Sequence, residues 1–160
     1  MRIFKGFICV MALVLASACG SSSPRSSLAE IELTKLDGTS TSIGAFSKDR
    51  PLLVSLWAVW CQPCKRELPA LQDISRQRQD LAILAINIGD DPEKIESFWA
   101  ENGLAISVAI DNNGALLEAL DAATVPVTVL FDAGGKILWS HLGAVDADQV
   151  NEALDTFTDL

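Results

Sequence analysis

Histidine, methionine and tyrosine are nearly absent from the 160-residue sequence. It contains one histidine (His141), no tyrosine and two methionines, both within the first eleven residues. A structural zinc site requires four ligands, usually cysteine and histidine, and a copper(I) carrier is favoured by soft sulfur ligands such as those of methionine-rich tracts. Because so few of these side chains are available, we expect no metal site in this chain.

Cysteine is also scarce, and its four positions fall into two groups. Cys9 and Cys19 lie in the first twenty residues, whereas Cys61 and Cys64 form a Cys-x-x-Cys pair. No further cysteine is available for a structural disulfide, so the fold has to be stabilised by a hydrophobic core. Since 49% of the residues are apolar, the composition predicts one globular domain with such a core.

Basic residues are outnumbered by acidic ones, 12 to 21, which gives a formal charge of -9. Without Arg2 and Lys5, which belong to a predicted signal segment, ten basic residues remain and the charge is about -11. An acidic surface argues against nucleic acid as a partner and against electrostatic binding to anionic lipid. It identifies no other partner.

A hydrophobic run long enough to span a membrane is missing as well. The apolar stretch of residues 6–15 is too short for a spanning helix. It follows a basic segment and precedes the small residues 16–18, an arrangement typical of a signal peptide. We therefore interpret residues 1–18 as a signal peptide, residues 19–29 as Cys19 with a flexible tether, and residues 30–160 as the folded domain.

Residues 15–19 read Leu-Ala-Ser-Ala-Cys and resemble a bacterial lipoprotein signal, in which the cysteine becomes the lipidated first residue. Ala16 departs from that pattern, which usually has leucine at the third position before the cysteine. We expect Cys19 to be lipidated; secretion into the periplasm without a lipid and an uncleaved signal anchor are the alternatives. Each of the three places the domain outside the cytoplasm, on the oxidising side of a bacterial membrane.

The remainder of the chain alternates between strand-like and helix-like segments. Continuous apolar character predicts buried strands over residues 52–58 and 81–88. Pro69 is expected to interrupt the helix of residues 61–78. The other expected strands cover residues 31–36, 106–110, 125–131 and 136–141, and the other expected helices cover residues 42–46, 92–102, 114–122 and 145–157. This alternation predicts an α/β sandwich with a mixed sheet.

The Cys-x-x-Cys pair lies between a buried strand and a helix, which predicts a dithiol redox site. Cys61 lies at the helix N-terminus, where unpaired N–H groups and the helix dipole stabilise a thiolate, so we interpret it as the nucleophile. Cys64 is the candidate resolving thiol. Gln62 and Pro63 shape the ring between the two sulfurs, and Pro63 stiffens it. This assignment requires adjacent sulfurs and an accessible Cys61.

Glu67 follows Cys64 by three residues, less than one helical turn. Its carboxylate could accept the proton of the Cys64 thiol, and its charge would raise the pKa values of nearby thiols. A simpler interpretation is a solvated glutamate in the first turns of a helix, where an acid is stabilised by the dipole. The spacing leaves both interpretations open.

Four motifs together resemble those of thioredoxin-fold proteins, and more narrowly those of the TlpA/ResA-type extracytoplasmic thiol-disulfide oxidoreductases. They are Trp57-Ala-Val-Trp-Cys-Gln-Pro-Cys64, Glu67 with Pro69, Thr124-Val125-Pro126, and the hairpin sequence of residues 131–137. The resemblance covers about residues 30–158. It implies a thioredoxin-like sandwich with a mixed central sheet and helices on both faces.

The resemblance also implies roles for individual residues. It implies a cis peptide bond before Pro126, which would turn the backbone of Val125 towards a substrate peptide. It implies that Glu67 tunes the dithiol, and we expect Trp60 to offer an apolar surface to substrate. No organic cofactor is expected. Two positions depart from the pattern: Ser55 replaces the buried aspartate of cytoplasmic thioredoxins, and Val125-Pro126-Val127 replaces the sequence typical of haem-maturation relatives.

The expected function is reduction of disulfides in exported proteins. The reductase direction is favoured because the charge of Glu67 opposes a strongly stabilised thiolate, which strong oxidants need. The expected partners are oxidised cysteines of exported proteins, a membrane thiol donor and the membrane itself through the lipid, with the protein as a monomer. A disulfide oxidase or isomerase on the same fold is one alternative, and a thiol-binding module of a copper or haem pathway is another.

Overall fold

The centre of the sheet is formed by the two segments whose apolar sequence predicts buried strands. The computed structural model describes residues 28–157, so the predicted signal peptide, Cys19 and most of the predicted tether lie outside the described residues. Strand β3 (Leu52–Trp57) pairs in parallel with β4 (Ala82–Asn87), and every residue of both strands is buried. Burial on both faces explains why neither sequence alternates between apolar and polar residues.

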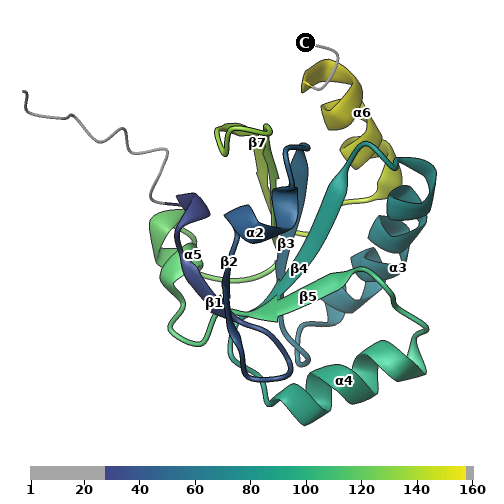
Figure 1. The fold of residues 1–160 in the computed structure, drawn as a ribbon. Helices are drawn as coiled ribbons and strands as arrows, with labels where there is room; N and C mark the ends of the chain where they lie inside the picture. Colours follow the sequence, from purple (N-terminus) through teal and green to yellow (C-terminus); the bar gives the residue numbers. More distant parts are fainter. Residues whose placement is uncertain (1–27, 158–160) are drawn as a thin grey trace, which may run out of the picture.

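Further strands extend the sheet on both sides of this pair. Next to β4 lies the parallel β5 (Ser107–Ile110), and next to β3 lies the antiparallel β6 (Val127–Phe131) with its hairpin partner β7 (Ile137–Leu142). The short strands β1 (Glu32–Thr34) and β2 (Ser40–Ser42) form the other edge. Within the described residues the order is β2-β1-β5-β4-β3-β6-β7, which confirms the predicted mixed sheet (Figure 1).

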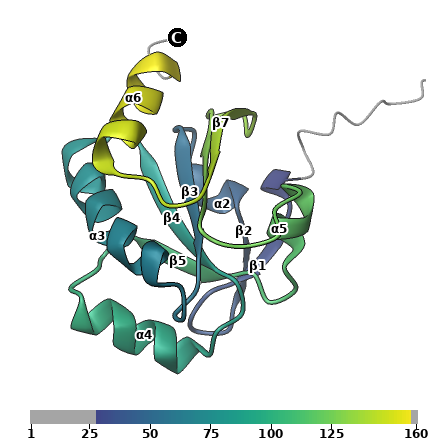
Figure 2. The same cartoon turned by 180° about the vertical axis from the view of Figure 1, so that it is seen from behind.

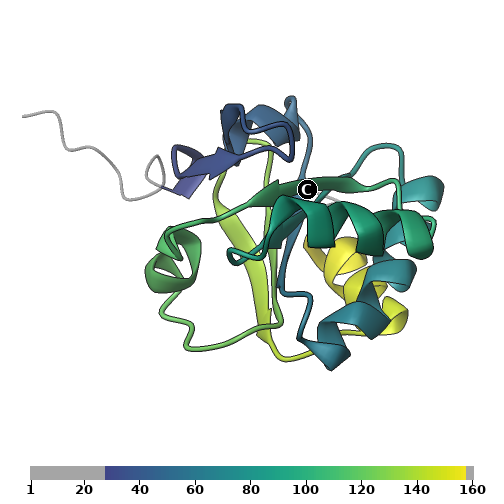
Figure 3. The same ribbon diagram turned by 90° about the horizontal axis from the view of Figure 1, so that it is seen from below.

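Helices cover both faces of this sheet, as the sequence predicts. The long helix α3 (Gln62–Gln77) packs against the C-terminal helix α6 (Ala147–Phe157) on one face (Figure 2). Helix α5 (Ala115–Ala119) lies on the opposite side of the strands (Figure 3). The short α2 (Gly44–Ser47) leads into β3, and α4 (Pro92–Glu101) connects β4 to β5.

An aromatic cluster fixes α4 beside the end of β3. Trp57, the last residue of β3, is fully buried, and its ring lies 4.9 Å from Trp99 and 5.4 Å from Phe98, measured between centroids. Lys65 of α3 places its ammonium 5.2 Å from the centre of the Phe98 ring, a cation–π contact. These contacts join β3, α3 and α4 where the Cys-x-x-Cys turn begins, and Trp57 is part of the core.

One expectation about local structure is wrong, one strand was not predicted, and a third segment differs from its interpretation. Helix α3 is continuous through Pro69, because that residue is exposed while its neighbours Leu68 and Leu71 are buried against the sheet. The strand β2 was not expected at all from its polar sequence. Leu28 and Ala29, interpreted as part of the tether, pack on the folded domain, Leu28 against the core and Ala29 beside Gly44.

Two leucines provide a matched test of where the stability resides. Leu53 in β3 has no exposed surface, whereas Leu142 in β7 is 70% exposed. We expect Leu53→Ala to lower the free energy of unfolding by about 2–5 kcal/mol, because it removes buried methyl groups and leaves a cavity. Leu142→Ala should change it by about 0.5 kcal/mol or less. Denaturant unfolding of both variants checks this, and equal losses would contradict the position of β3 in the core.

Candidate active site

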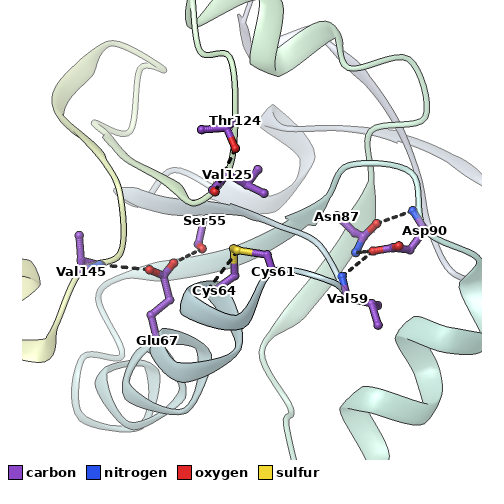
Figure 4. Close-up of a disulfide and its surroundings, with 10 residues drawn as sticks. All are labelled: Ser55, Val59, Cys61, Cys64, Glu67, Asn87, Asp90, Thr124, Val125 and Val145. Atoms are coloured by element: carbon purple, nitrogen blue, oxygen red, sulfur yellow. Dashed lines mark hydrogen bonds between the residues drawn. A yellow bond between two sulfur atoms is a disulfide. The ribbon is translucent and has the colours of Figure 1, made fainter.

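Cys61 is the N-cap residue of α3, directly after the turn that leaves β3. Its backbone is extended, with φ −82° and ψ 97°, and its Sγ accepts a hydrogen bond from the backbone N–H of Cys64 at 3.3 Å (Figure 4). The N–H of Cys61 donates to Ala58 O at 3.0 Å, which closes the turn. The predicted position of Cys61 at a helix N-terminus is confirmed, and with it a backbone donor directed at the sulfur that would carry the thiolate.

Cys61 and Cys64 form a disulfide in the structure, with their Cα atoms 5.3 Å apart. The two sulfurs are therefore adjacent, as the redox interpretation requires. Gln62 and Pro63 form the first turn of α3 between them, and the side chain of Gln62 is exposed. Their influence on the ring stays a prediction.

Cys61 is less accessible to solvent than the redox assignment led us to expect. Cys61 is only 3% exposed and Cys64 has no exposed surface, whereas the neighbouring Trp60 is 64% exposed. Of the two cysteines, only Cys61 has any exposed surface, so a partner can approach the disulfide only from the side of Cys61. The exposed indole of Trp60 beside it fits the predicted role of an apolar contact surface.

Glu67 is buried rather than solvated, so the simpler interpretation of this residue is wrong. Its side chain, from the second turn of α3, is 2% exposed, and its two oxygens accept hydrogen bonds from Ser55 Oγ at 2.6 Å and from the backbone N–H of Val145 at 3.1 Å (Figure 4). Burial raises the pKa of the Glu67 carboxyl, and the hydrogen bonds from Ser55 and Val145 partly oppose that rise.

The peptide bond between Val125 and Pro126 is cis, as the resemblance implies. Because Val127 pairs with Leu56, the cis bond lies beside the end of β3, from which the cysteine turn starts. The carbonyl of Pro126 accepts a hydrogen bond from Gly143 N–H at 2.9 Å, which ties this loop to the end of β7. Both Val125 and Pro126 are buried, and their contact with substrate stays a prediction.

Sequence reasoning missed the polar contacts that follow β4. The carboxylate of Asp90 accepts hydrogen bonds from the backbone N–H of Val59 at 2.6 Å and from Asn87 Nδ2 at 2.9 Å (Figure 4). The available signal was the sequence Asn-Ile-Gly-Asp at the end of a buried strand, since neighbouring parallel strands end at the same edge of a sheet. The role of Ser55 was missed because it was considered only as a substitute for aspartate.

Neither a metal cluster nor a membrane span is found in the part of the chain that the structure describes. Across residues 28–157, no group of three or more histidine, cysteine, aspartate or glutamate side chains is arranged to hold a metal ion. Among the helices of the same residues, none combines the length and apolarity needed to cross a bilayer. His141 lies on β7, with its ring 5.9 Å from that of Trp139.

The sequence matches relatives that carry out thiol-disulfide exchange. ResA, a thiol-disulfide oxidoreductase from Geobacillus thermodenitrificans, is 27% identical over 143 residues, which cover 88% of this chain and 79% of ResA. The sporulation thiol-disulfide oxidoreductase A from Bacillus subtilis is 25% identical over 111 residues, which cover 66% of this chain and 67% of the relative.

Solved structures share the fold. StoA from Bacillus subtilis superimposes with a TM-score of 0.64 at 24% identity, over 76% of this chain and 93% of StoA. A DsbF homologue from Corynebacterium diphtheriae gives a TM-score of 0.68 at 25% identity, over 81% and 85% of the two chains. The sequence pattern of the Redoxin family matches residues 20–156. The chain therefore belongs to the Redoxin family, and it is a TlpA/ResA-like thiol-disulfide oxidoreductase with Cys61 and Cys64 as its Cys-x-x-Cys pair.

Proposed function

We propose that this oxidoreductase acts outside the cytoplasm, tethered to a membrane through a lipid on Cys19, and that it reduces disulfides in exported proteins. The signal-like sequence of residues 1–18 supports the location. The observation that carries the direction is the buried carboxyl of Glu67, which follows Cys64 on the helix that starts at the disulfide.

The reaction begins with the dithiol form. The Cys61 thiolate, held by the N–H of Cys64, attacks one sulfur of the substrate disulfide. A mixed disulfide forms, and the first substrate thiolate leaves. Cys64 then loses its proton and attacks Cys61 Sγ, so the second substrate thiolate leaves and the Cys61–Cys64 disulfide remains. Two electrons have passed to the substrate. A membrane thiol donor then supplies two electrons that reduce the Cys61–Cys64 disulfide to the dithiol again.

Glu67 is proposed to accept the proton of Cys64. A carboxyl whose pKa is raised by burial holds a proton more readily near neutral pH than a solvated one does. When Glu67 is ionised, its charge raises the pKa of nearby thiols and so limits how far the dithiol form is stabilised. Strong oxidants depend on such stabilisation, so Glu67 favours the reductase direction.

The proposed substrate surface consists of Trp60 and the loop around Pro126. Trp60 is 64% exposed beside Cys61, the one cysteine of the pair with any exposed surface. The cis bond lies at the same end of β3, which supports the proposal that the backbone of Val125 pairs with a substrate peptide as a neighbouring strand would. We propose oxidised cysteine-containing exported proteins as substrates and a monomer as the working form.

A trapping experiment tests the exchange and its direction together. Cys64→Ser leaves Cys61 without its resolving partner, so mixed disulfides with substrates should accumulate. An extract of exported proteins whose free thiols are blocked beforehand supplies only disulfides, and reduced Cys64→Ser should capture proteins from it that are released by dithiothreitol. Cys61→Ser should capture none, because Cys64 is inaccessible. Absence of adducts with Cys64→Ser would refute the reductase step.

Glu67→Gln should stabilise the oxidised protein at neutral pH but leave its stability unchanged at low pH. The folded pKa of Glu67 is raised, so its contribution to stability is fully present below the unfolded pKa and is lost as the pH rises through the folded pKa. Glutamine preserves the neutral state throughout, since its amide can donate to Ser55 while its oxygen accepts Val145 N–H.

Denaturant unfolding at about pH 4 and about pH 8 measures this difference. Glu101→Gln, which removes an exposed carboxyl, controls for net charge. A constant difference between wild type and Glu67→Gln would contradict the predicted titration. In the exchange reaction the same variant lacks the proposed base, so its mixed disulfide between Cys61 and substrate should persist longer than that of wild type.

Removal of the lipid site tests the tether. In cells supplied with radiolabelled palmitate, the full chain should incorporate label and fractionate with membranes, and Cys19→Ser should do neither. Cys9→Ser, which changes a cysteine within the predicted signal peptide, is the matched control and should retain label. Equal labelling of wild type and Cys19→Ser would exclude lipidation at this residue.

A further inference from the structure

The backbone hydrogen bonds between β3 and β4 end just before the cysteine turn. The last of them runs from Ile88 N–H to Trp57 O at 3.1 Å. In a continued parallel ladder, the next donor on β3, Val59 N–H, would pair with the backbone of the neighbouring strand. Here it donates instead to the Asp90 carboxylate at 2.6 Å, so one side chain extends the pairing beyond the point where the two chains separate.

The Asp90 carboxylate is itself held by the end of β4. Asn87 is fully buried; its Nδ2 donates to Asp90 Oδ2 at 2.9 Å and its Oδ1 accepts from Asp90 N–H at 2.7 Å. Gly89, with φ +100°, supplies the left-handed conformation that lets the chain return towards Asn87. The carboxylate therefore occupies a fixed position, and the hydrogen bond to Val59 transmits that position to the cysteine turn (Figure 4).

The turn from Val59 to Cys61 has other restraints in the oxidised protein: Val59 packs against the core, and the carbonyl of Cys61 accepts a hydrogen bond from Lys65 N–H at 3.2 Å. Cys61 N–H is bonded to Ala58 O, and the exposed Trp60 lies between the two held ends. In the oxidised protein the covalent bond to Cys64 also fixes Cys61. In the dithiol form that bond is gone, and the contact between Asp90 and Val59 remains to hold the segment that precedes the leading sulfur.

We propose that Asp90 is a positioning residue of the exchange reaction: its hydrogen bond to Val59 N–H keeps Trp60 and the Cys61 sulfur aligned for attack while the disulfide is open. The inference rests on the proposed role of Cys61 as the attacking thiol. Asp90 acts through the backbone and touches neither substrate nor the reacting atoms.

Three variants separate position from charge. Asp90→Ala removes the acceptor. Asp90→Asn removes the charge but keeps one oxygen, which is sufficient because Val59 N–H and Asn87 Nδ2 both donate to the same Oδ2. Asp91→Asn is the matched control: it removes the same charge from the next residue, an exposed side chain paired only loosely with Lys94 at 3.6 Å.

Two measurements report on the dithiol form. One is the rate at which iodoacetamide alkylates Cys61 in the reduced protein at neutral pH, which requires no substrate. The other is the pair of kcat and KM for reduction of insulin, with dithiothreitol as electron donor. We expect Asp90→Ala to lower kcat by about tenfold with little change in KM, since small misplacements of a reacting group cost that much or more. Alkylation should slow as well.

Asp90→Asn should stay within about twofold of wild type in both measurements, because both hydrogen bonds persist. Asp91→Asn should match wild type. Equal losses in Asp90→Ala and Asp90→Asn would assign the effect to charge and overturn the proposal, as would an Asp90→Ala variant that behaves like wild type. If Asp90→Ala does not fold, Asn87→Ala provides the test, because it keeps Asp90 but removes the side chain that holds its carboxylate. Asn87→Ala should lower both kcat and the alkylation rate. If both values equal those of wild type, the proposal is overturned.

Failure of the positioning role of Asp90 and failure of the proposed function give different results. If Cys61 is not the attacking thiol, Cys61→Ser retains insulin reduction and alkylation of wild type occurs elsewhere. If Cys61 attacks but Asp90 does not position it, Cys61→Ser is inactive while Asp90→Ala retains wild-type rates.

Discussion

The parallel pairing of β3 with β4 determines where the chemistry of this protein takes place. Both strands are buried throughout and run in the same direction, so they end at one edge of the sheet. The cysteine turn follows β3, and the Asn87–Asp90 turn follows β4. The antiparallel β6 begins at the same edge, which places Pro126 beside them. Three segments distant in sequence are thereby brought to one site without any further structural device.

Within that site, helix α3 combines two electrostatic environments that are six residues apart, less than two helical turns. At its N-terminus, a backbone N–H points at Cys61 and favours negative charge on sulfur. At Glu67 the helix faces the sheet, where burial disfavours negative charge. The loop before α6 contacts both Glu67 and the loop that contains the cis peptide bond: Gly143 N–H donates to Pro126 O, and Val145 N–H donates to the Glu67 carboxyl. The loop that contains the cis peptide bond and the buried acid are thus both bound to one short segment.

Much of this arrangement could be predicted from the sequence. Apolar runs located the central strands, and the position of the Cys-x-x-Cys pair between strand and helix located the disulfide. The burial of Glu67 was also available, because Cys64, Glu67, Leu68 and Leu71 follow helical spacing and lie on one buried face. The spacing between Cys64 and Glu67 alone does not show whether Glu67 faces the core or the solvent. The sequence indicated polar residues at the end of β4, but not that Asp90 accepts a hydrogen bond from Val59 N–H, since that contact depends on strand register and on the conformation of Gly89.

The complete burial of Cys64 has a consequence for the order of events. A molecule arriving from solution can approach Cys61 but not Cys64. A mixed disulfide with Cys64 therefore does not form. Each mixed disulfide therefore forms at Cys61 and is resolved by the buried Cys64. Because Cys64 is shielded from solvent, its thiol can react only with Cys61.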